Sequence, residues 1–326
     1  MIEKKRIGLF TSGGDAPGMN AAIRAVVRTA IHYDLEVVGI MRGYEGMIDN
    51  EMQLLDSNSV SGIINRGGTI LKTARSERFR TDEGMAKAFQ NLQSQNISGL
   101  IAIGGDGTFR GANAFLEKHS IPTIGIPGTI DNDLYGTDFT IGYDTAINTA
   151  MEAIDKIRDT ADAHNRLFFI EVMGRDAGFI AMRSGIAGGA EAILVPESKT
   201  DLDAVIDLLQ RGWNRKKTSN IVVVAEGDEA GGAFKVAEAV KGKLQQFDTR
   251  VSIIGHTQRG GAPTCMDRVL ASRLGVAAVE ALLNGKQNVM VGVLHRDISY
   301  TPFNQATKHN LDVNLNLLRI AEILSS

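Results

Sequence analysis

Three glycine-rich segments of the chain carry hydroxyl or carboxylate side chains where phosphate and metal chemistry is possible. They are residues 12–20 (SGGDAPGMN), 104–108 (GGDGT) and 127–133 (PGTIDND). Glycine lets backbone N–H groups approach a phosphate, and the amino end of a following helix favours negative charge. The first segment matches neither the Walker pattern nor the Gly-x-Gly-x-x-Gly dinucleotide pattern. Taken alone, it is equally consistent with a structural turn.

Asp106 stands at the centre of the second segment and is a candidate magnesium ligand. Mg²⁺ keeps several waters and takes only one or two protein carboxylates beside substrate phosphates, so a single aspartate suffices. The alternative is that Asp106 is the N-cap of a helix predicted over residues 108–118. The two roles are compatible.

The third segment places Thr129, Asp131 and Asp133 two residues apart. Alternate residues of an extended loop point to the same side, so these side chains are expected to face one pocket. An aspartate that faces a hydroxyl can accept its proton while the oxygen attacks phosphorus. Judged by itself, the segment is better explained as an Asx-rich turn.

Four arginines lie in glycine-rich loops rather than on predicted helix faces: Arg66, Arg75, Arg175 and Arg259. A guanidinium group suits bidentate phosphate contacts, and glycine neighbours leave room for a ligand. Together with the two aspartate-bearing loops, they indicate a phosphate site rather than solvated turns. His256 has no second histidine at metal-ligand spacing, so it is either a hydrogen-bond donor to an oxyanion or a core residue.

These loops need a scaffold, and the sequence predicts one from a repeated β-α-β pattern. Short runs rich in Ile and Val, each followed by glycines and then by helical spacing, are typical of parallel strands with crossover helices. Strands are predicted at residues 6–11, 36–40, 99–103, 123–126, 167–172, 192–195, 221–225, 251–254 and 289–294, and helices at 19–32, 108–118, 144–158, 201–211 and 267–283. The glycine-rich loops then follow strands, at the edge where open α/β sheets bind ligands.

Composition and charge narrow the classes of function. A chain of 326 residues is long enough for two domains. A formal net charge of -3 and a pI near 6.1 argue against nucleic acid or an anionic membrane as a partner. The single cysteine, Cys265, excludes an internal disulfide or a multi-cysteine metal site, which favours a cytoplasmic protein. The amino terminus shows no signal-peptide pattern and no window is apolar enough to span a membrane.

Six motifs in this order resemble the family of bacterial ATP-dependent 6-phosphofructokinases. They are SGGDAPGMNAAIR (12–24), NRGGT (65–69), GGDG (104–107), PGTIDND (127–133), MGR (173–175) and HTQRGG (256–261). GGDG alone is shared with NAD kinases and diacylglycerol kinases, so the ordered set carries the resemblance. It implies an α/β fold of two lobes, each a mostly parallel sheet sandwiched by helices, with the active site in the cleft between them. Residues 1–142 with 258–308 would bind ATP and Mg²⁺, and 143–257 with 309–326 the sugar phosphate.

The resemblance also implies the reaction and the residues that perform it. ATP would phosphorylate the 1-hydroxyl of fructose 6-phosphate, the committed step of glycolysis, with Mg²⁺ as cofactor. Asp131 would be the general base, with Thr129, Arg175 and Arg75 as the other catalytic residues. The ATP site would comprise Gly14, Arg75, Gly104, Asp106, Gly107 and Thr108, with Asp106 as the metal ligand. The sugar-phosphate site would comprise Thr129, Asp131, Asp133, Arg166, Met173, Gly174, Arg175, Glu226, Arg250, His256 and Arg259.

Two of these residues, Arg166 and Arg250, would reach the sugar phosphate from a neighbouring subunit, so the resemblance implies an oligomer, a homotetramer. An effector pocket for ADP or phosphoenolpyruvate would use Arg24, Arg28, Arg158, Glu191 and Lys217. By spacing alone, Arg24 and Arg28 are only a pair on one helix face. Ser57 stands where such proteins often carry an effector-binding arginine, so altered or weakened allostery is expected.

The phosphoryl donor can be argued from two glycines. Pyrophosphate-dependent relatives carry aspartate at the position of Gly107 and lysine at that of Gly128. Since a carboxylate at the first position would crowd and repel the α-phosphate of a nucleotide, ATP is favoured.

Two alternatives remain: another kinase that shares GGDG, or a nucleotide-binding subunit without catalysis. PGTIDND and HTQRGG argue against the first, and the presence of every expected Asp and Arg argues against the second.

Overall fold

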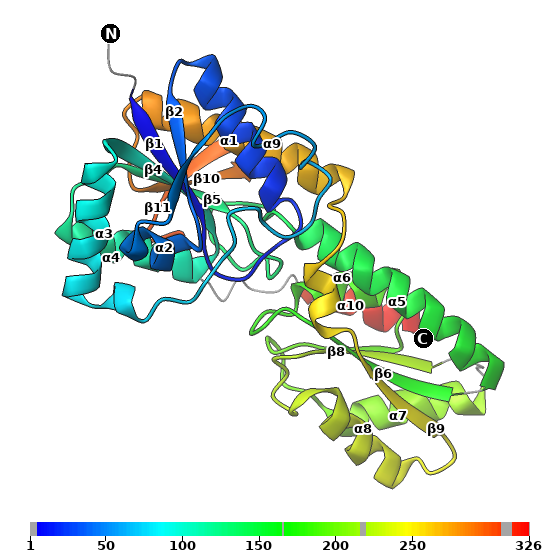
Figure 1. Cartoon of the computed structure of the whole chain (residues 1–326). Coiled ribbons are helices and arrows are strands. Elements are labelled where there is room, and N and C mark those ends of the chain that lie inside the picture. The colour runs from blue at the N-terminus through cyan, green and yellow to red at the C-terminus, as the bar shows by residue number, and fades with distance from the viewer. Residues whose placement is uncertain (1–4, 165, 216–219, 308–314, 326) are drawn as a thin grey trace. The chain divides into compact units, whose positions relative to one another are not determined.

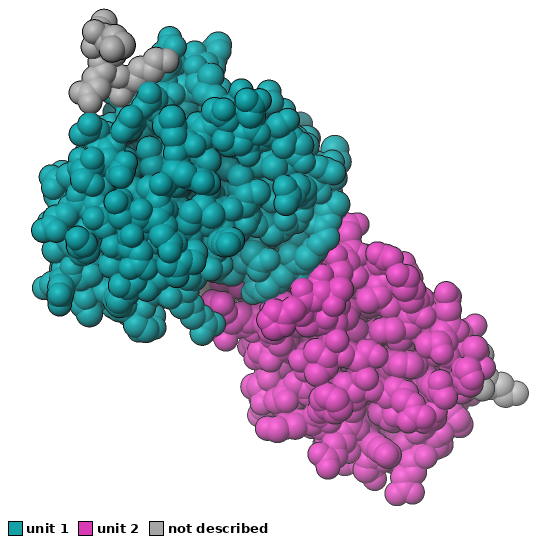
Figure 2. All heavy atoms as spheres, in the orientation of Figure 1, with its two compact units in different colours: residues 1–130, 134–145, 259–309 teal, residues 131–133, 146–258, 310–326 magenta. Residues whose placement is uncertain are grey.

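The chain folds as two α/β units, and the computed structural model describes residues 5–164, 166–215, 220–307 and 315–325. Residues 1–130, 134–145 and 259–309 form the first unit, and residues 131–133, 146–258 and 310–326 form the second (Figure 2). Each unit is built on one sheet flanked by helices, as the sequence predicts. Within the described ranges, no helix is both long enough and apolar enough to cross a membrane.

The first unit contains a seven-stranded sheet in the order β11-β10-β5-β4-β1-β2-β3. Its strands are β1 (Arg6–Thr11), β2 (Glu36–Ile40), β3 (Met52–Leu55), β4 (Ile97–Gly104), β5 (Thr123–Pro127), β10 (Val289–Leu294) and β11 (Asp297–Pro302). The five central strands are parallel, and only the edge strands β3 and β11 pair antiparallel. Successive residues of β1, β4 and β5 are buried on both sides of the strand, as expected for a sheet covered on both faces.

Helices α1 (Met19–His32) and α9 (Cys265–Leu283) pack together over one face of this sheet (Figure 1). The other face is covered by α2 (Gly43–Asp49), α3 (Asp82–Ser94), α4 (Asp106–Lys118) and the short 3₁₀ helix η1 (Arg78–Arg80). The Tyr44 ring stacks on Phe79 at 4.1 Å between centroids, and its hydroxyl donates to the carbonyl of Thr108 at 2.6 Å. This contact fixes α2 against the first turn of α4.

The second unit contains a fully parallel sheet in the order β7-β8-β6-β9. Its strands are β6 (Arg166–Val172), β7 (Ala192–Leu194), β8 (Asn220–Ala225) and β9 (Asp248–Ile253). One face packs on α7 (Leu202–Asn214) and α8 (Gly232–Lys243) through buried residues such as Leu209, Val236 and Val240. Helices α6 (Phe179–Ala187) and α10 (Leu315–Ser325) lie on the other face, and α5 (Tyr143–His164) enters the unit at residue 146 (Figure 1).

Each sheet has a point at which the chain leaves neighbouring strands in opposite directions. In the first sheet, β1 leads through α1 to β2, whereas its neighbour β4 leads through α4 to β5 on the other side. In the second sheet, β6 leads through α6 to β7, whereas its neighbour β8 leads through α8 to β9. Ligands of open α/β sheets bind outside the carboxyl ends of the strands at such points. Ligand sites are therefore expected at the loops after β1, β4, β6 and β8.

Candidate active site

The loops after β1 and β4 are locked together at the first of these points. The Ser12 N–H donates to the carbonyl of Ile103 at 3.0 Å, and Thr108 Oγ1 donates to the carbonyl of Ser12 at 3.1 Å. A Cβ at Gly104 would overlap Thr108 Oγ1 and lie 2.5 Å from the Ser12 carbonyl oxygen. Gly104 and the buried Thr108, both predicted to bind ATP, thus set the spacing between the two loops.

Open space and positive charge lie at the same loops. No heavy atom approaches within 4 Å of a Cβ placed on Gly107, in the first turn of α4, so the amino end of that helix is accessible to a ligand. The guanidinium of Arg259 lies against Gly14, 2.6 Å from a Cβ placed there, and Nη1 donates to the carbonyl of Asp15 at 3.2 Å. Helix N–H groups, glycine and arginine together can hold an anion.

Asp106 is the first residue of α4, and Gly105 is the N-cap. The side chain of Asp106 is 19% exposed, and its Oδ1 accepts a hydrogen bond from Arg110 Nε at 3.0 Å. Among the described residues, no group of three or more His, Cys, Asp and Glu side chains could hold a metal ion. A lone carboxylate beside a phosphate site is the arrangement that Mg²⁺ accepts, because substrate phosphates and water complete its coordination.

The segment that carries Thr129, Asp131 and Asp133 is not extended throughout, so the extended backbone assumed for it was wrong. Asn132 adopts a left-handed backbone with φ of 53°, which breaks the alternation between its neighbours. All three predicted side chains are nevertheless buried, at 9%, 4% and 4% exposure. Thr129 lies beside Gly105, whose Cβ position is 3.4 Å from Thr129 Cβ, and its carbonyl accepts from Thr140 Oγ1 at 2.6 Å. The directions of the Thr129, Asp131 and Asp133 side chains are therefore set by a turn and not by a straight strand.

Asp267 anchors the start of α5, which follows this segment along the chain, and was missed by the sequence analysis. Its Oδ1 accepts from the Gly142 N–H at 2.8 Å, and its Oδ2 accepts from both the N–H and the hydroxyl of Thr145, at 2.8 and 2.5 Å. Burial raises the pKa of the Asp267 carboxyl above its ordinary value, although these hydrogen bonds oppose the shift. In sequence the residue is only an acidic group in the first turn of a helix, so no pattern identified it.

Asn20 organises the loop that carries Arg66. Its Nδ2 donates to the carbonyls of Arg66 and Gly67 at 3.1 Å each, and its Oδ1 accepts from the Ile70 N–H at 2.8 Å. A Cβ at Gly67 would overlap the carbonyl of Gly261, so this loop rests on the glycine-rich segment after Arg259. The predicted phosphate ligand Arg75, further along the same connection, is exposed.

The loops after β6 and β8, at the second point where the chain leaves neighbouring strands in opposite directions, carry four of the predicted sugar-phosphate residues. Met173 and Gly174 are buried at the end of β6, whereas Arg175 and Glu226 are exposed. Arg175 has a left-handed backbone with φ of 56°, and its N–H donates to Glu226 Oε1 at 2.7 Å. Non-glycine residues rarely adopt this conformation, which persists where neighbouring contacts impose it and is frequent at binding sites. Four predicted residues are thus brought together by two neighbouring strands.

Gln258 was also missed, although it lies inside the HTQRGG motif. It is fully buried, and its Oε1 accepts from the Met173 N–H at 2.9 Å. It therefore joins the end of β6 to the 3₁₀ helix η2 (Gly255–Arg259), in which His256 is exposed. The motif supplies a structural amide as well as candidate ligands.

Arg166 begins β6, at the opposite end of the second sheet from Arg175, and Arg250 on β9 is paired with Phe168, two residues further along β6. Both contact Asp248, through Arg166 Nε at 2.7 Å and Arg250 Nη2 at 3.1 Å, and these hydrogen bonds and charges lower the pKa of Asp248. Arg166 begins β6, and Met173 follows its end. A strand of seven residues spans about 20 Å. The chain therefore does not bring Arg166 to its own Arg175 turn.

Comparison with known proteins identifies the family of the chain. Residues 6–282 match the sequence model of the family described as phosphofructokinase. The chain belongs to the phosphofructokinase family. Its relatives include the ATP-dependent 6-phosphofructokinase 1 of Thermus thermophilus, 59% identical over 321 residues, which cover 98% of this chain and 99% of that protein. The ATP-dependent 6-phosphofructokinase of Cytophaga hutchinsonii is 56% identical over 321 residues, 98% of each chain.

A solved phosphofructokinase has the same fold. The structure of the enzyme from Saccharomyces cerevisiae superimposes with a TM-score of 0.88 at 36% identity and covers 99% of this chain. The chain spans only 48% of that longer protein. The family resemblance inferred from the six motifs is thus confirmed by sequence and by fold.

The predicted effector residues of this phosphofructokinase are distributed over both units. Arg24 is half-buried and Arg28 is exposed on α1 of the first unit. In the second unit Arg158 Nη2 donates to the carbonyls of Gly188 and, at 2.9 Å, Gly189. Lys217 lies outside the described residues.

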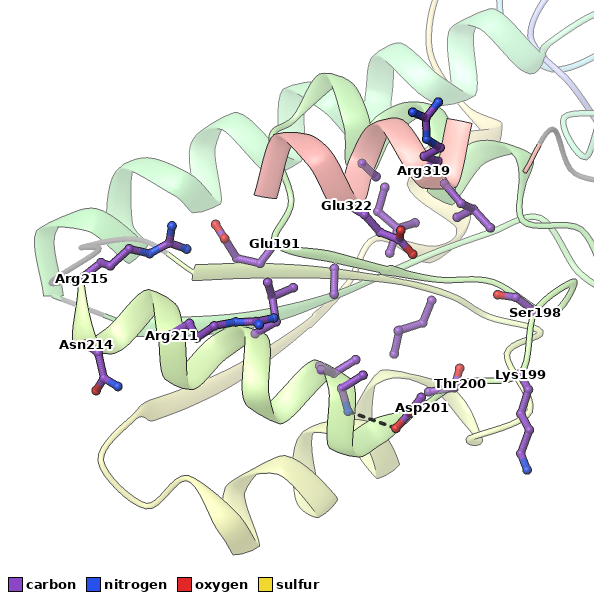
Figure 3. Close-up of a pocket in the computed structure, with 18 residues that line it drawn as sticks. Glu191, Ser198, Lys199, Thr200, Asp201, Arg211, Asn214, Arg215, Arg319 and Glu322 are labelled. Carbon is purple, nitrogen blue, oxygen red and sulfur yellow. Dashed lines mark hydrogen bonds between the residues drawn. The ribbon is translucent and has the colours of Figure 1, made fainter. Parts of the chain in front are cut away.

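Glu191 is buried in the second unit and lines a cavity of about 1070 Å³ between β7, α7 and α10. Figure 3 shows it at the end of this cavity where Arg211, Asn214 and Arg215 gather.

Proposed function

We propose that this chain transfers the γ-phosphoryl group of ATP to the 1-hydroxyl of fructose 6-phosphate and forms ADP and fructose 1,6-bisphosphate. The observation that carries the proposal is 59% identity over 98% of the chain with a protein named as an ATP-dependent 6-phosphofructokinase. Further support comes from two strand-end sites, one suited to phosphates and one with a guanidinium and a carboxylate.

In this proposal the first unit binds ATP. The β- and γ-phosphates lie against the backbone near Gly14 and the amino end of α4 at Gly107, where the open space noted above is available. Arg75 approaches the phosphates from the neighbouring loop. Asp106 holds Mg²⁺, which neutralises charge on the phosphate oxygens when it is bound.

The second unit binds fructose 6-phosphate through Asp133, Met173, Gly174, Arg175, Glu226 and His256, and Arg259 is a further proposed ligand of the sugar phosphate. The carboxylate of Asp131 accepts the proton of the sugar 1-hydroxyl as that oxygen bonds to the γ-phosphorus and the bond to the ADP oxygen breaks. Thr129 and Arg175 donate hydrogen bonds to the phosphoryl oxygens during the transfer. The protein contributes alignment and charge neutralisation rather than a covalent intermediate.

An oligomer completes the site. Arg166 lies a full strand away from Arg175, and Arg250 is paired with Phe168 inside the sheet, so we propose that both serve the sugar 6-phosphate of another subunit in a cytoplasmic homotetramer. Both guanidinium groups donate to Asp248 Oδ2, Arg166 at 2.7 Å and Arg250 at 3.1 Å, and this shared partner keeps the two arginines close together. ADP and phosphoenolpyruvate are the proposed effectors.

A coupled assay tests the proposal. It compares ATP with pyrophosphate as donor, and fructose 6-phosphate with fructose 1-phosphate and tagatose 6-phosphate as acceptor. ATP and fructose 6-phosphate are expected to give the highest kcat/KM. The variant Asp131→Ala should bind ATP normally and lose about 10²–10⁴-fold in kcat, the usual contribution of a general base. Near-normal turnover by this variant would remove Asp131 from its proposed role.

A further inference from the structure

The turn between β6 and α6 is held by side-chain oxygens from other loops. Three backbone N–H groups of this turn each donate to one such oxygen. The pairs are Met173 with Gln258 Oε1 at 2.9 Å, Arg175 with Glu226 Oε1 at 2.7 Å and Gly178 with Glu197 Oε1 at 2.7 Å. Within the turn, the Ala177 N–H donates to the Gly174 carbonyl at 3.0 Å. The backbone path of the Arg175 turn, residues 173–178, is therefore imposed from outside the turn.

Glu197 contacts the last residue of this turn closely. A Cβ at Gly178 would lie 2.5 Å from Val195 Cβ and 2.7 Å from Glu197 Oε2, so only glycine allows the backbone to approach the segment after β7. Glu197 Oε2 is buried, and no described residue forms a hydrogen bond with it. A desolvated carboxylate oxygen without a hydrogen-bond partner lowers the stability of the fold, so the Glu197 side chain has an energetic cost in this position. Burial accordingly raises the pKa of Glu197.

The hydrogen bond to Gly178 bears on Arg175, three residues earlier. A left-handed backbone is unfavourable for a non-glycine residue because its Cβ crowds the carbonyl oxygen, so contacts at the ends of the turn are needed to hold Arg175 at φ of 56°. Gln258 holds one end of the turn and Glu197 holds the other, where α6 begins. We propose that Glu197 is a positioning residue, whose hydrogen bond to Gly178 keeps the Arg175 turn in the conformation that binds the sugar phosphate. This inference rests on the proposed function.

The test compares Glu197→Ala and Glu197→Gln with the control Glu238→Ala, an exposed glutamate on α8 of the same unit. Loss of a single hydrogen bond that orients a ligand group is worth about tenfold, so Glu197→Ala should raise KM for fructose 6-phosphate by about that factor. KM for ATP should be unchanged. Glu197→Gln should stay close to wild type, because its amide oxygen can accept the same N–H. The control should equal wild type in every parameter.

Several outcomes would overturn the inference. If Glu197→Ala has the same KM for fructose 6-phosphate and for ATP as the control, Glu197 does not act on the Arg175 turn. The same conclusion follows if both KM values rise by the same factor. If Glu197→Ala fails to fold, Glu197→Asp replaces it, because its side chain is one methylene too short to reach Gly178. If KM for fructose 6-phosphate rises in Glu197→Asp but not in Glu197→Gln, the inference is supported. If the two variants have the same KM for fructose 6-phosphate, the inference is overturned. A wild-type protein that does not phosphorylate fructose 6-phosphate would instead overturn the proposed function.

Discussion

The substitution Gly107→Asp separates the stability of the fold from the binding of the nucleotide. Apart from its chain neighbours and the backbone of α4, nothing lies within 4 Å of the Cβ position, so a side chain that starts there enters open space. Gly107 lies in the first turn of α4, where an acidic side chain stabilises a helix by about 0.3–1 kcal/mol through the helix dipole. Replacement of a helical glycine also adds a few tenths of a kcal/mol. The melting temperature is therefore expected to stay the same or to rise slightly.

Nucleotide binding should respond in the opposite direction. The open space that admits the carboxylate is the space proposed for the ATP phosphates, so the two negative charges would lie about 4–5 Å apart. At an effective dielectric constant of about 20, Coulomb repulsion at that distance is about 3–4 kcal/mol. Bound Mg²⁺ and solvent screen part of this repulsion. If about half remains, KM for ATP rises by roughly 10–30-fold.

Steady-state kinetics with ATP at saturating fructose 6-phosphate, together with thermal unfolding, measure both effects. Gly107→Asn is the matched control for size, since its side chain has the same shape without charge. Gly242→Asp is the control for a charged residue in a helix, because that α8 glycine also has no atom within 4 Å of its Cβ position. Neither control should change KM for ATP as much as Gly107→Asp does.

The reasoning fails if Gly107→Asp keeps the wild-type KM for ATP, because the phosphates would then lie elsewhere. It also fails if Gly107→Asn raises KM as much as Gly107→Asp, since steric exclusion rather than charge would then be the cause.

Three further predictions follow from the same contacts. Arg250→Ala and Asp131→Ala should each be nearly inactive, but subunits of the two variants mixed and reassembled should regain activity at sites that combine intact residues; no recovery would argue against shared sites. Because the pKa of Asp267 is raised in the fold, its contribution to stability is fully present below its ordinary pKa of 3.8 and is lost as pH rises through the raised value. Across that window the free energy of unfolding of wild type should therefore decline relative to Asp267→Asn, and parallel pH profiles would contradict this. Finally, wild type should respond weakly to ADP and phosphoenolpyruvate, and Ser57→Arg should strengthen the response; a strong response of wild type would refute the first part.

The amino-acid pattern predicted the central strands well and the edges poorly. Predicted and observed bounds agree for the strands β1, β2 and β10 and for the helix α1. Buried parallel strands are continuous apolar runs, which makes their limits visible in the sequence. The short edge strand β3 has two exposed residues in four, and β11 is also largely accessible, so neither shows such a run. Helix α6 (FIAMRSGIA) is mostly buried and apolar around most of its circumference, so it has little helical periodicity. These elements, with α2, α3, α8 and α10, were not predicted.

Residue types and their order along the chain were enough to determine the α/β class and the family, because glycine, aspartate and arginine after apolar strands are local features. Tertiary structure alone decided how the loops after these strands are held. Asp267, Gln258 and Glu197 accept hydrogen bonds from N–H groups between 19 and 125 residues away, and no local pattern marks such partners. It also decided, through the direction of β6, that Arg166 and Arg175 lie at opposite ends of one sheet. Pairings across the chain depend on the whole packed core, whereas a motif depends only on its own neighbours.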